Sequence, residues 1–322
     1  MRDRRPHLYG ILVTFRRPQA LSAMLQALAE QTRPLHHLVV VDNGPTEEGR
    51  ALVHAHKVRG SEVEYLALHE NLGPAGGIAS GMQRLLPTAD DDDWVVLLDD
   101  DDPPQDHDVL EQLFRFAQEM WERDRRTGGV GLGGSSLDLR RGRLVRTEDS
   151  QLGGPVLVDH VPGNQLPLYR VEAIRRVGPF RAELFFGFEE LEFGLRMRRA
   201  GYTIYAHGEL WAQRRAALRM TGTRSLRPAL RLPEPDWRRY YSLRNLIYIL
   251  RSLGLASAAW RVTLVRGIGK PLANLPLNPR RAAGELASNW RACRDGWRGT
   301  LGRRVEPDPT QPRSRTVWSH GS

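Results

Sequence analysis

Short apolar runs alternate with helical patterns through the first hundred residues, and this alternation constrains the fold more than any other feature. The runs are residues 8–14, 38–41, 63–68 and 94–98. After the first run, Pro18 opens a segment with apolar residues at the i, i+3, i+4, i+7 spacing of a helix that lies on a sheet: Leu21, Met24, Leu25 and Leu28. Strands that alternate with helices are typical of a parallel sheet with crossover helices. We therefore predict an α/β fold.

Three of the predicted strands end in polar residues, namely Thr14, Asp42 and Asp99. In open α/β sheets, ligands bind at the carboxyl ends of the strands. A glycine-rich segment, NLGPAGG at residues 71–77, precedes a helix predicted at 78–86. Its backbone N–H groups could approach a phosphate or ribose, or its glycines could simply form a tight turn. The strand ends thus predict a ligand site, and the glycines leave both interpretations open.

Four consecutive aspartates, residues 99–102, directly follow an apolar strand. Their mutual repulsion is unfavourable, and a divalent cation would relieve it. Mg²⁺ or Mn²⁺ commonly pairs one or two carboxylates with substrate phosphates. The alternative is a solvated acidic turn, which is how we interpret the earlier run at residues 90–93. No EF-hand spacing and no GxxxxGK[ST] motif is present, which excludes these two kinds of site.

The rest of the chain divides by composition. Residues 128–162 are rich in glycine and predict edge hairpins. The segment at residues 185–190 is predicted to start a helix that runs through Ala200 and is closed by Gly201. We expect an α/β domain at residues 1–215, a proline-rich connector at 216–236, a helical extension at 237–304 and a disordered tail at 305–322. There is no internal repeat.

The net charge of +9 is concentrated near the C-terminus, where residues 237–304 hold 14 Lys/Arg against Glu285 and Asp295. This asymmetry suggests an anionic partner, either lipid headgroups or nucleic acid. The lone Cys293 excludes an intramolecular disulfide and a cysteine-based zinc cluster, and fits a reducing cytoplasm. We find neither a secretory signal core nor an apolar stretch of the roughly 18 residues that a membrane span needs.

Four ordered motifs resemble the inverting family 2 glycosyltransferases, in particular the bacterial galactofuranosyl- and rhamnosyltransferase-like branch. They are ILVTFRRPQALSAMLQALAEQTRPLHHLVVVDNG, ENLGPAGGIASGM, DWVVLLDDDDPP and FFGFEELEFGLRMRRAGY. The likeness covers about residues 7–215, and WRRYYSLRNLIYILR and CRDGWRGTLG extend it into the tail. It implies a GT-A fold, a Rossmann-like nucleotide-binding sheet flanked by helices. It also implies a UDP- or dTDP-sugar donor, such as UDP-galactofuranose or a dTDP-rhamnose-like donor, and Mn²⁺ or Mg²⁺.

The resemblance also assigns site residues. It implies that Thr14, Phe15 and Arg17 line the nucleotide pocket, with Asp42 facing the base and ribose and Asn71, Gly73, Gly76 and Gly77 beside the nucleotide. In the DxD-type motif, Asp99 and Asp101 would hold the metal, and Asp100 would lie near the ribose or diphosphate. Glu189 and Glu190 fall where the family has an acidic pair that supplies the general base. Either carboxylate could instead complement the helix dipole, as we interpret Glu192, which we expect to pair with Arg196.

Two departures from the family pattern stand out. The base pair is more often aspartate, which is one methylene shorter than glutamate. This branch also usually carries a metal-binding histidine just after the tryptophan that corresponds to Trp211, where this chain has Ala212. His207 lies five positions earlier and could replace it only through a rearranged loop.

The likeness suggests a glycan or polyprenyl-linked acceptor in cell-envelope polysaccharide synthesis. With the basic, aromatic helices of the extension, it predicts a cytoplasmic protein attached to the inner face of the plasma membrane. One rival interpretation is a nucleotidyltransferase, although VTFRRPQA lacks the expected glycines. Another is a glycosyltransferase-like protein that binds nucleotide or glycan without turnover. No nucleic-acid partner is expected, because no recognition motif accompanies the charge.

Overall fold

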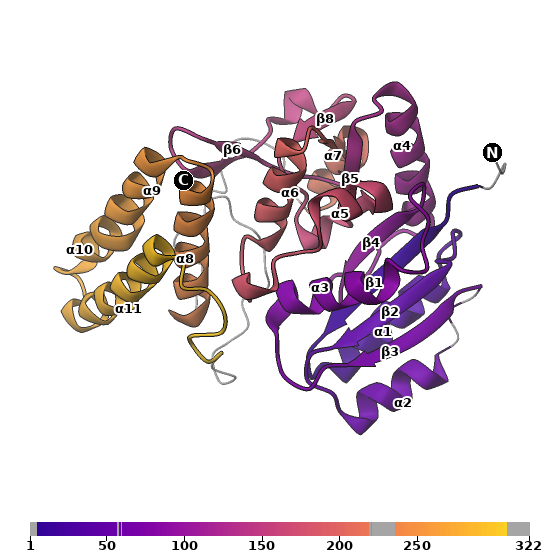
Figure 1. Ribbon diagram of the computed structural model, residues 1–322, viewed down its shortest axis with the longest axis horizontal. Helices are drawn as coiled ribbons and strands as arrows, with labels where there is room; N and C mark the ends of the chain where they lie inside the picture. The colour runs from indigo at the N-terminus through magenta and orange to yellow at the C-terminus, as the bar shows by residue number, and fades with distance from the viewer. Residues whose placement is uncertain (1–4, 57, 59, 219, 221–235, 308–322) are drawn as a thin grey trace. The chain divides into compact units, whose positions relative to one another are not determined.

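A computed structural model describes residues 5–56, 58, 60–218, 220 and 236–307 (Figure 1). The chain forms two compact units. The first comprises residues 1–135, 147–182 and 190–221, and the second comprises 136–146, 183–189 and 222–322. The connector predicted at 216–236 and the tail predicted at 305–322 lie largely outside the described residues.

The first unit is built on an eight-stranded sheet in the order β3-β2-β1-β4-β9-β5-β10-β8. The strands are β1 (Leu8–Thr14), β2 (His37–Asp42), β3 (Glu62–Ala67), β4 (Trp94–Asp99), β5 (Thr127–Gly131), β8 (Pro155–Val158), β9 (Leu168–Arg170) and β10 (Thr203–His207). The strands β1 to β4 pair in parallel, while β9 runs antiparallel between β4 and β5. The predicted α/β fold is confirmed.

The strand register brings the polar strand ends together. Thr14 pairs with Asp42 across β1 and β2, and Val13 pairs with Asp99 across β1 and β4. Both β1 and β4 are buried on both faces, as parallel strands rich in Val, Leu and Ile usually are. The side chains of Thr14, Asp42 and Asp99 therefore lie side by side at the carboxyl-terminal ends of three neighbouring strands.

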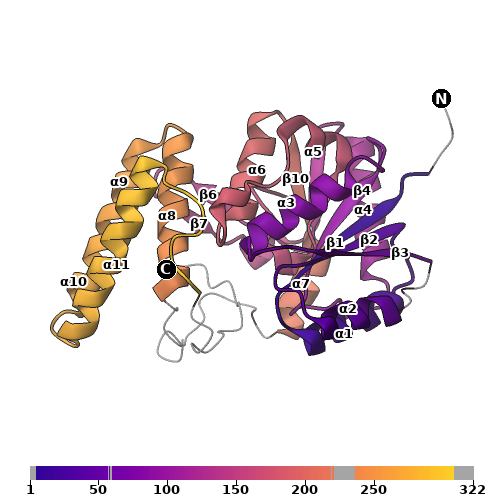
Figure 2. The ribbon, with the colours of Figure 1, turned by 60° about the horizontal axis from the view of Figure 1, so that its bottom comes forward.

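Helices cover both faces of this sheet (Figure 2). They are α1 (Pro18–Ala29), α2 (Glu47–Ala55), α3 (Gly73–Leu85), α4 (Val109–Arg123), α5 (Val171–Val177), α6 (Glu189–Arg199) and α7 (Gly208–Ala217). One apolar cluster joins the sheet to α1, α2 and α4, and the other joins it to α3, α5 and α6. Short 3₁₀ turns occur at Asp149–Gln151, Gly163–Gln165 and Ala182–Leu184.

The helix predicted at 78–86 begins earlier, at Gly73, so the glycine-rich segment forms its first turn. The helix packs closely on β1. A Cβ at Gly77 would lie 2.7 Å from a methyl group of Val13, and one at Gly81 would lie 2.5 Å from Ile11. Glycine therefore lets the helix approach the sheet more closely than any other residue would.

The edge hairpins predicted for residues 128–162 are only partly right. β5 is an interior strand, because its glycines let it lie between β9 and β10, and a Cβ at Gly129 would meet the Tyr169 ring at 2.7 Å. A hairpin does form from β6 (Ser136–Asp138) and β7 (Arg143–Val145), but it belongs to the second unit. Of the strands that residues 128–162 contribute to the large sheet, β8 is the one at an edge.

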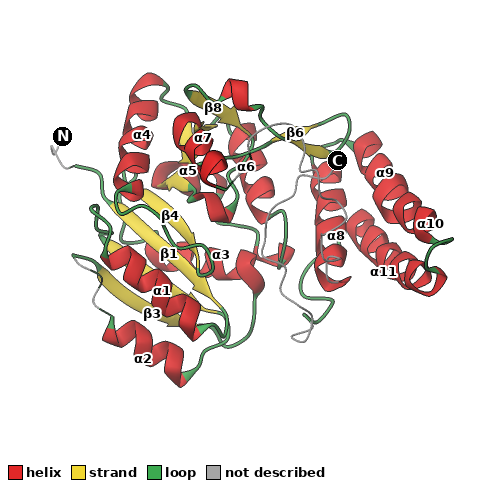
Figure 3. Ribbon diagram, turned by 180° about the vertical axis from the view of Figure 1, so that it is seen from behind, coloured by secondary structure: helices red, strands yellow, loops and turns green. Residues whose placement is uncertain are grey.

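The second unit is mainly helical (Figure 3). It contains α8 (Asp236–Ser252), α9 (Ala256–Val262), the π-helical turns η5 (Thr263–Gly269), α10 (Lys270–Asn274) and α11 (Pro279–Arg298). The helices α8 and α11 pack along each other, and Gly296 allows a close contact because a Cβ there would lie 2.7 Å from the Arg244 carbonyl. Among the described residues, no helix is long and apolar enough to cross a bilayer.

Candidate active site

Three carboxylates gather where β4 ends. Asp99, Asp100 and Asp101 each offer an oxygen atom, and these atoms lie within 4.8 Å of one another. In the part of the chain that the structure describes, this is the one group of His, Cys, Asp and Glu ligands compact enough to share a cation. The oxygen donors suit Mg²⁺ or Mn²⁺.

Residues from the β1 end hold two of these carboxylates in place. The Thr14 hydroxyl donates to Asp100 Oδ2 at 2.7 Å. The Arg17 guanidinium donates to Asp100 Oδ1 at 2.8 Å and to Asp101 Oδ2 at 2.9 Å. Arg17 therefore neutralises part of the cluster and links the loop after β1 to the loop after β4.

The cluster remains electrostatically unfavourable despite Arg17. Part of the Asp99 side chain reaches solvent, yet the protein packed around its carboxyl group, together with the charges of Asp101 and Asp100, raises its pKa well above the ordinary value. Burial also raises the pKa of Asp100, and Arg17 and Thr14 offset only part of that shift. A divalent cation would stabilise the ionised forms, so the residues present fit the implied metal.

The fourth aspartate has a different partner. Asp102 accepts from Arg214 of α7 at 2.5 Å, and the same nitrogen atom of Arg214 lies 3.3 Å from the Asn164 carbonyl. Burial raises the pKa of Asp102, and Arg214 opposes that shift. Asp102 therefore anchors α7 to the aspartate loop. Sequence reasoning missed this contact, because the two residues are 112 positions apart.

Asp42 is held from two sides at the end of β2. Its Oδ1 accepts from the Gly44 N–H at 2.9 Å, and its Oδ2 accepts from the Tyr65 hydroxyl at 2.9 Å. Burial, and then Asp42 itself, raises the pKa of Tyr65. Phe15 lies directly against Gly44, where a Cβ would come within 2.6 Å of its ring. Phe15 and Asp42 thus both lie against Gly44, and Tyr65 is a partner that the sequence did not single out.

Asn43 fixes the glycine-rich segment. Its side chain accepts from the Leu72 N–H at 3.2 Å and donates to the Gly73 carbonyl at 3.0 Å. The Asn71 side chain in turn accepts from the Gly73 N–H at 2.9 Å. A Cβ at Gly76 would lie 2.4 Å from Leu72 Cβ. The glycines thus have a packing role, and Asn43 is a second residue that sequence reasoning missed.

The acidic pair lies in the first turn of α6, where both carboxylates are buried. Glu190 Oε1 accepts from the Gly163 N–H at 3.0 Å. Burial raises the pKa of Glu190, and the Glu190 charge helps to raise the pKa of the buried Tyr169. The prediction for Glu192 is confirmed, because Arg196 donates to its carboxylate at 2.9 Å.

His207 is the least supported of the proposed metal ligands. Its ring packs on Phe116 with the centroids 4.6 Å apart, and burial lowers its pKa. Among the described residues, the compact group of three carboxylates does not include His207. Ala212 is partly buried and packs against the apolar cluster that includes Trp211. The structure therefore does not bring a histidine from α7 or its start into the aspartate group.

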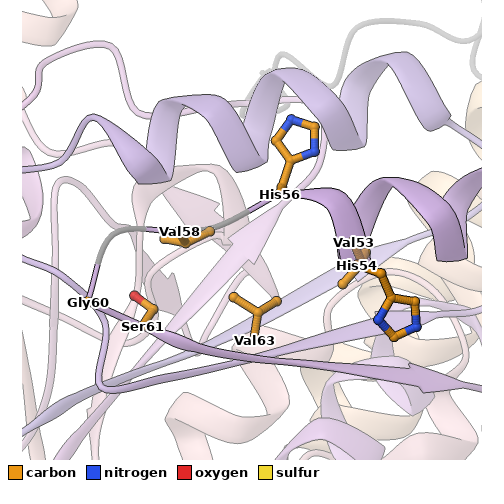
Figure 4. Close-up of a pocket in the computed structure, with 7 residues that line it drawn as sticks. All are labelled: Val53, His54, His56, Val58, Gly60, Ser61 and Val63. Atoms are coloured by element: carbon orange, nitrogen blue, oxygen red, sulfur yellow. The ribbon is translucent and has the colours of Figure 1, made fainter.

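A hollow of about 510 Å³ lies away from these residues, between the end of α2 and the start of β3. Figure 4 shows its lining side chains, among them His54 and His56. The His56 ring nitrogen lies 2.9 Å from the Leu52 carbonyl, and His54 packs near Tyr65. None of the predicted site residues lines this hollow.

Known proteins resemble this chain in sequence and in fold. Residues 11–129 match the family described as glycosyl transferase family 2. Galactofuranosyltransferase GlfT1 of Mycobacterium tuberculosis is 30% identical over 263 residues, which covers 77% of this chain and 83% of that protein. GlfT1 of Mycolicibacterium smegmatis is 30% identical over 262 residues, with 76% and 83% covered.

Two solved structures share the fold. Mannosyltransferase PcManGT from Pyrobaculum calidifontis, in complex with GDP-Man and Mn²⁺, has a TM-score of 0.52 at 17% identity, with 92% of this chain and 88% of that chain covered. GalNAc-T7 with UDP, GalNAc and Mn²⁺ has a TM-score of 0.53 at 12% identity, with 78% and 48% covered.

Proposed function

Since the chain belongs to glycosyltransferase family 2, and is therefore a glycosyltransferase with a GT-A fold, we propose that it transfers a hexose with inversion. The proposed donor is UDP-galactofuranose or a dTDP-rhamnose-like sugar nucleotide. The proposed acceptor is a hydroxyl group of a glycan or polyprenyl-linked glycan in cell-envelope polysaccharide synthesis. The GlfT1 relatives favour galactofuranose, and the observation that carries the proposal is the alignment of Thr14, Asp42 and Asp99 at one sheet edge.

The nucleotide would bind along that edge. Asp42, oriented by Tyr65, would face the base and ribose, and Phe15 beside Gly44 would supply an apolar wall. Asp99 and Asp101 would hold Mn²⁺ or Mg²⁺, which would supply charge neutralisation for the departing diphosphate. Arg17 would then be available to the phosphates, and Asp100 would stay fixed by Thr14.

We assign the general base to Glu190. Burial raises its pKa, so its carboxylate is a stronger proton acceptor than an exposed glutamate. The Gly163 N–H holds one of its oxygen atoms and fixes the orientation of the group. The carboxylate would take the proton from the acceptor hydroxyl as that oxygen attacks the anomeric carbon and the nucleoside diphosphate leaves. Glu189 is the alternative base.

Transfer assays with UDP-galactofuranose and dTDP-rhamnose in the presence of Mn²⁺ test this assignment. We expect Asp99→Ala and Asp101→Ala to abolish transfer and to remove the Mn²⁺ signal that electron paramagnetic resonance detects in the wild type. Glu190→Gln should lower kcat by roughly 100-fold or more while nucleotide affinity is retained, whereas Glu189→Gln should be milder. A wild type that binds UDP but transfers no sugar would instead support a binding protein without turnover.

The helical unit offers a surface for an anionic membrane. Its exposed large apolar residues lie in α9 to α11 and between them: Trp260, Leu264, Val265, Leu272, Leu275, Leu277 and Trp290. Around them lie basic residues, with Glu285 as the single acidic residue between positions 260 and 290: Arg261, Arg266, Lys270, Arg280 and Arg281. Apolar side chains with basic neighbours favour the interface of an acidic bilayer. We propose that this surface keeps the enzyme on the inner face of the plasma membrane, beside a lipid-linked acceptor.

A vesicle flotation assay tests whether this surface binds a membrane or merely exposes apolar side chains to solvent. Leu277 is 85% exposed and Trp290 is 67% exposed, whereas Leu157, in β8 of the sheet unit, is 60% exposed and serves as a matched control. The wild type and Leu157→Ser should float with phosphatidylglycerol vesicles, and the Leu277→Ser/Trp290→Ser variant should not. Equal flotation of both variants, or no flotation of the wild type, would contradict the proposal.

A further inference from the structure

The segment that leads into the acidic pair has an unfavourable backbone. Phe185 has a φ of +62° and Phe188 a φ of +65°, with Gly187 at +83° between them. A positive φ is uncommon in residues with a side chain and is strained in bulky ones. Such a conformation persists only where surrounding contacts impose it, and strain of this kind clusters at functional sites. Residues 185–188 directly precede Glu189 and Glu190 in the chain.

Two polar residues of α8 supply those contacts. The Asn245 side-chain amide donates to the carbonyl groups of Leu184 at 3.0 Å, Phe186 at 2.9 Å and Gly187 at 2.8 Å. Arg244 Nη2 donates to the Leu184 carbonyl at 2.8 Å. Three backbone carbonyl groups between residues 184 and 187 thus accept these bonds, so the contacts do not depend on the side chains of the segment.

Arg244 and Asn245 are both fully buried, at 0% exposure. Arg244 Nε donates to Asn245 Oδ1 at 2.9 Å, so the arginine orients the amide. Arg244 Nη1 donates to the Gly302 carbonyl at 2.6 Å, and its guanidinium lies 4.7 Å from the Tyr241 ring centroid. Burial of a guanidinium and an amide is costly unless each donor finds an acceptor. Here the acceptors are mainly backbone carbonyl groups at and beside the strained segment.

We propose that Arg244 and Asn245 are positioning residues for the general base. They hold residues 184–187 in the one backbone conformation from which the first turn of α6 presents its carboxylates. The inference rests on the proposed function for the identity of the base. It adds two residues of α8, in the sequence YYSLRNLIYILR, to the residues that position that base. A displacement of a reacting group by about 1 Å can lower a rate about 100-fold, so loss of this support should reduce turnover more than binding.

The same unit contains a matched control. Asn289 of α11 is also buried, at 2% exposure, and its amide donates to the carbonyl groups of Arg266 at 3.3 Å and Gly267 at 3.1 Å. Its Oδ1 likewise accepts from an arginine, Arg239, at 3.3 Å. Asn245 and Asn289 therefore have the same chemistry, and they differ in the segment that they hold.

The test compares Asn245→Ala with Asn289→Ala in the full-length enzyme. We expect both variants to lose a similar amount of thermal stability. Asn245→Ala alone should lower kcat about tenfold or more, with donor KM and UDP affinity within about twofold of the wild type. It alone should also lose hydrogen-exchange protection at the amides of residues 185–190. Arg244→Lys, which keeps the charge but loses the planar fork, is the second variant if Asn245→Ala does not fold.

Two results would overturn the inference: an equal fall in kcat in both asparagine variants, or exchange protection lost in Asn245→Ala without any fall in kcat. Failure of the proposed function is distinguishable from these. If both Glu189→Gln and Glu190→Gln keep the wild-type kcat, the base assignment fails. If the wild type transfers no sugar, hydrogen exchange still tests whether Asn245 holds the segment. Equal protection of residues 185–190 in both asparagine variants would then overturn the inference.

Discussion

Replacement of Thr14 by valine tests how the aspartate cluster is held. The Thr14 hydroxyl donates to Asp100 at 2.7 Å, and both side chains are 3% exposed. A hydrogen bond to a charged group contributes about 1.5–3 kcal/mol to stability. The methyl group that replaces the hydroxyl is buried, which returns about 0.8 kcal/mol. We therefore expect Thr14→Val to lower the free energy of unfolding by about 1–2 kcal/mol at pH 7.

The pH dependence distinguishes this contact from a neutral one. Asp100 has a raised pKa in the folded protein, so the native state binds its proton more tightly than the unfolded chain does, and stability falls as pH rises through that range. Thr14 opposes this shift by stabilising the carboxylate. The cost of Thr14→Val should therefore be largest at neutral pH and should shrink as Asp100 becomes protonated at acidic pH.

Urea unfolding followed by circular dichroism at several pH values measures the effect. Thr127→Val is the matched control, because the Thr127 hydroxyl is buried but donates to the neutral carbonyl groups of Met120 and Asp124. Its cost of about 0.5–1.5 kcal/mol should not change with pH. Equal and pH-independent costs for the two variants would refute the reasoning and would mean that Thr14 does not stabilise an ionised Asp100.

Four further outcomes follow from the structure. Gly194→Ala should destabilise the protein by about 3 kcal/mol, because a Cβ there would lie 2.0 Å from the Asp159 carbonyl oxygen. In contrast, Gly284→Ala, which meets nothing within 4 Å in α11, should stabilise it by about 0.5–1 kcal/mol in urea unfolding. The kcat–pH profile should show an acid limb above the ordinary glutamate pKa of 4.5, since the proposed base Glu190 would have to be ionised to accept a proton, and Glu190→Gln should lack that limb. Burial raises the pKa of Cys293 to about 11, so its thiol should react with a disulfide reagent at pH 8 only after denaturation, and fast labelling of the native enzyme would contradict its burial.

The sheet and its polar edge could be predicted because their determinants are local. The strand Leu8–Thr14 and the start of α1 at Pro18 are read directly from apolar runs and helical spacing, and the structure has the same bounds. The gathering of Thr14, Asp42 and Asp99 then follows from parallel pairing alone. The start of α3 was not predicted, because its first turn is rich in glycine, which has a low helix propensity.

The partners that orient the site could not be predicted, because they are far apart in sequence. Tyr65 reaches Asp42 across 23 positions, and Arg214 reaches Asp102 across 112. No local pattern distinguishes these residues from other surface tyrosines and arginines. The same is true of Asn245, which reads as an interruption in an apolar helix until the backbone of residues 184–187 is placed beside it.

The position of β9 has a consequence for synthesis of the chain. In the finished sheet, β9 separates β4 from β5, yet it is formed by residues 168–170, well after both neighbours. As the chain leaves the ribosome, β1 to β4 can assemble first and will present the hydrogen-bonding edge of β4 to solvent until some 70 further residues have been made. An unpaired apolar edge invites association with other chains. Folding in this order would include a stage in which β1 to β4 are paired and the sheet is still open beside β4.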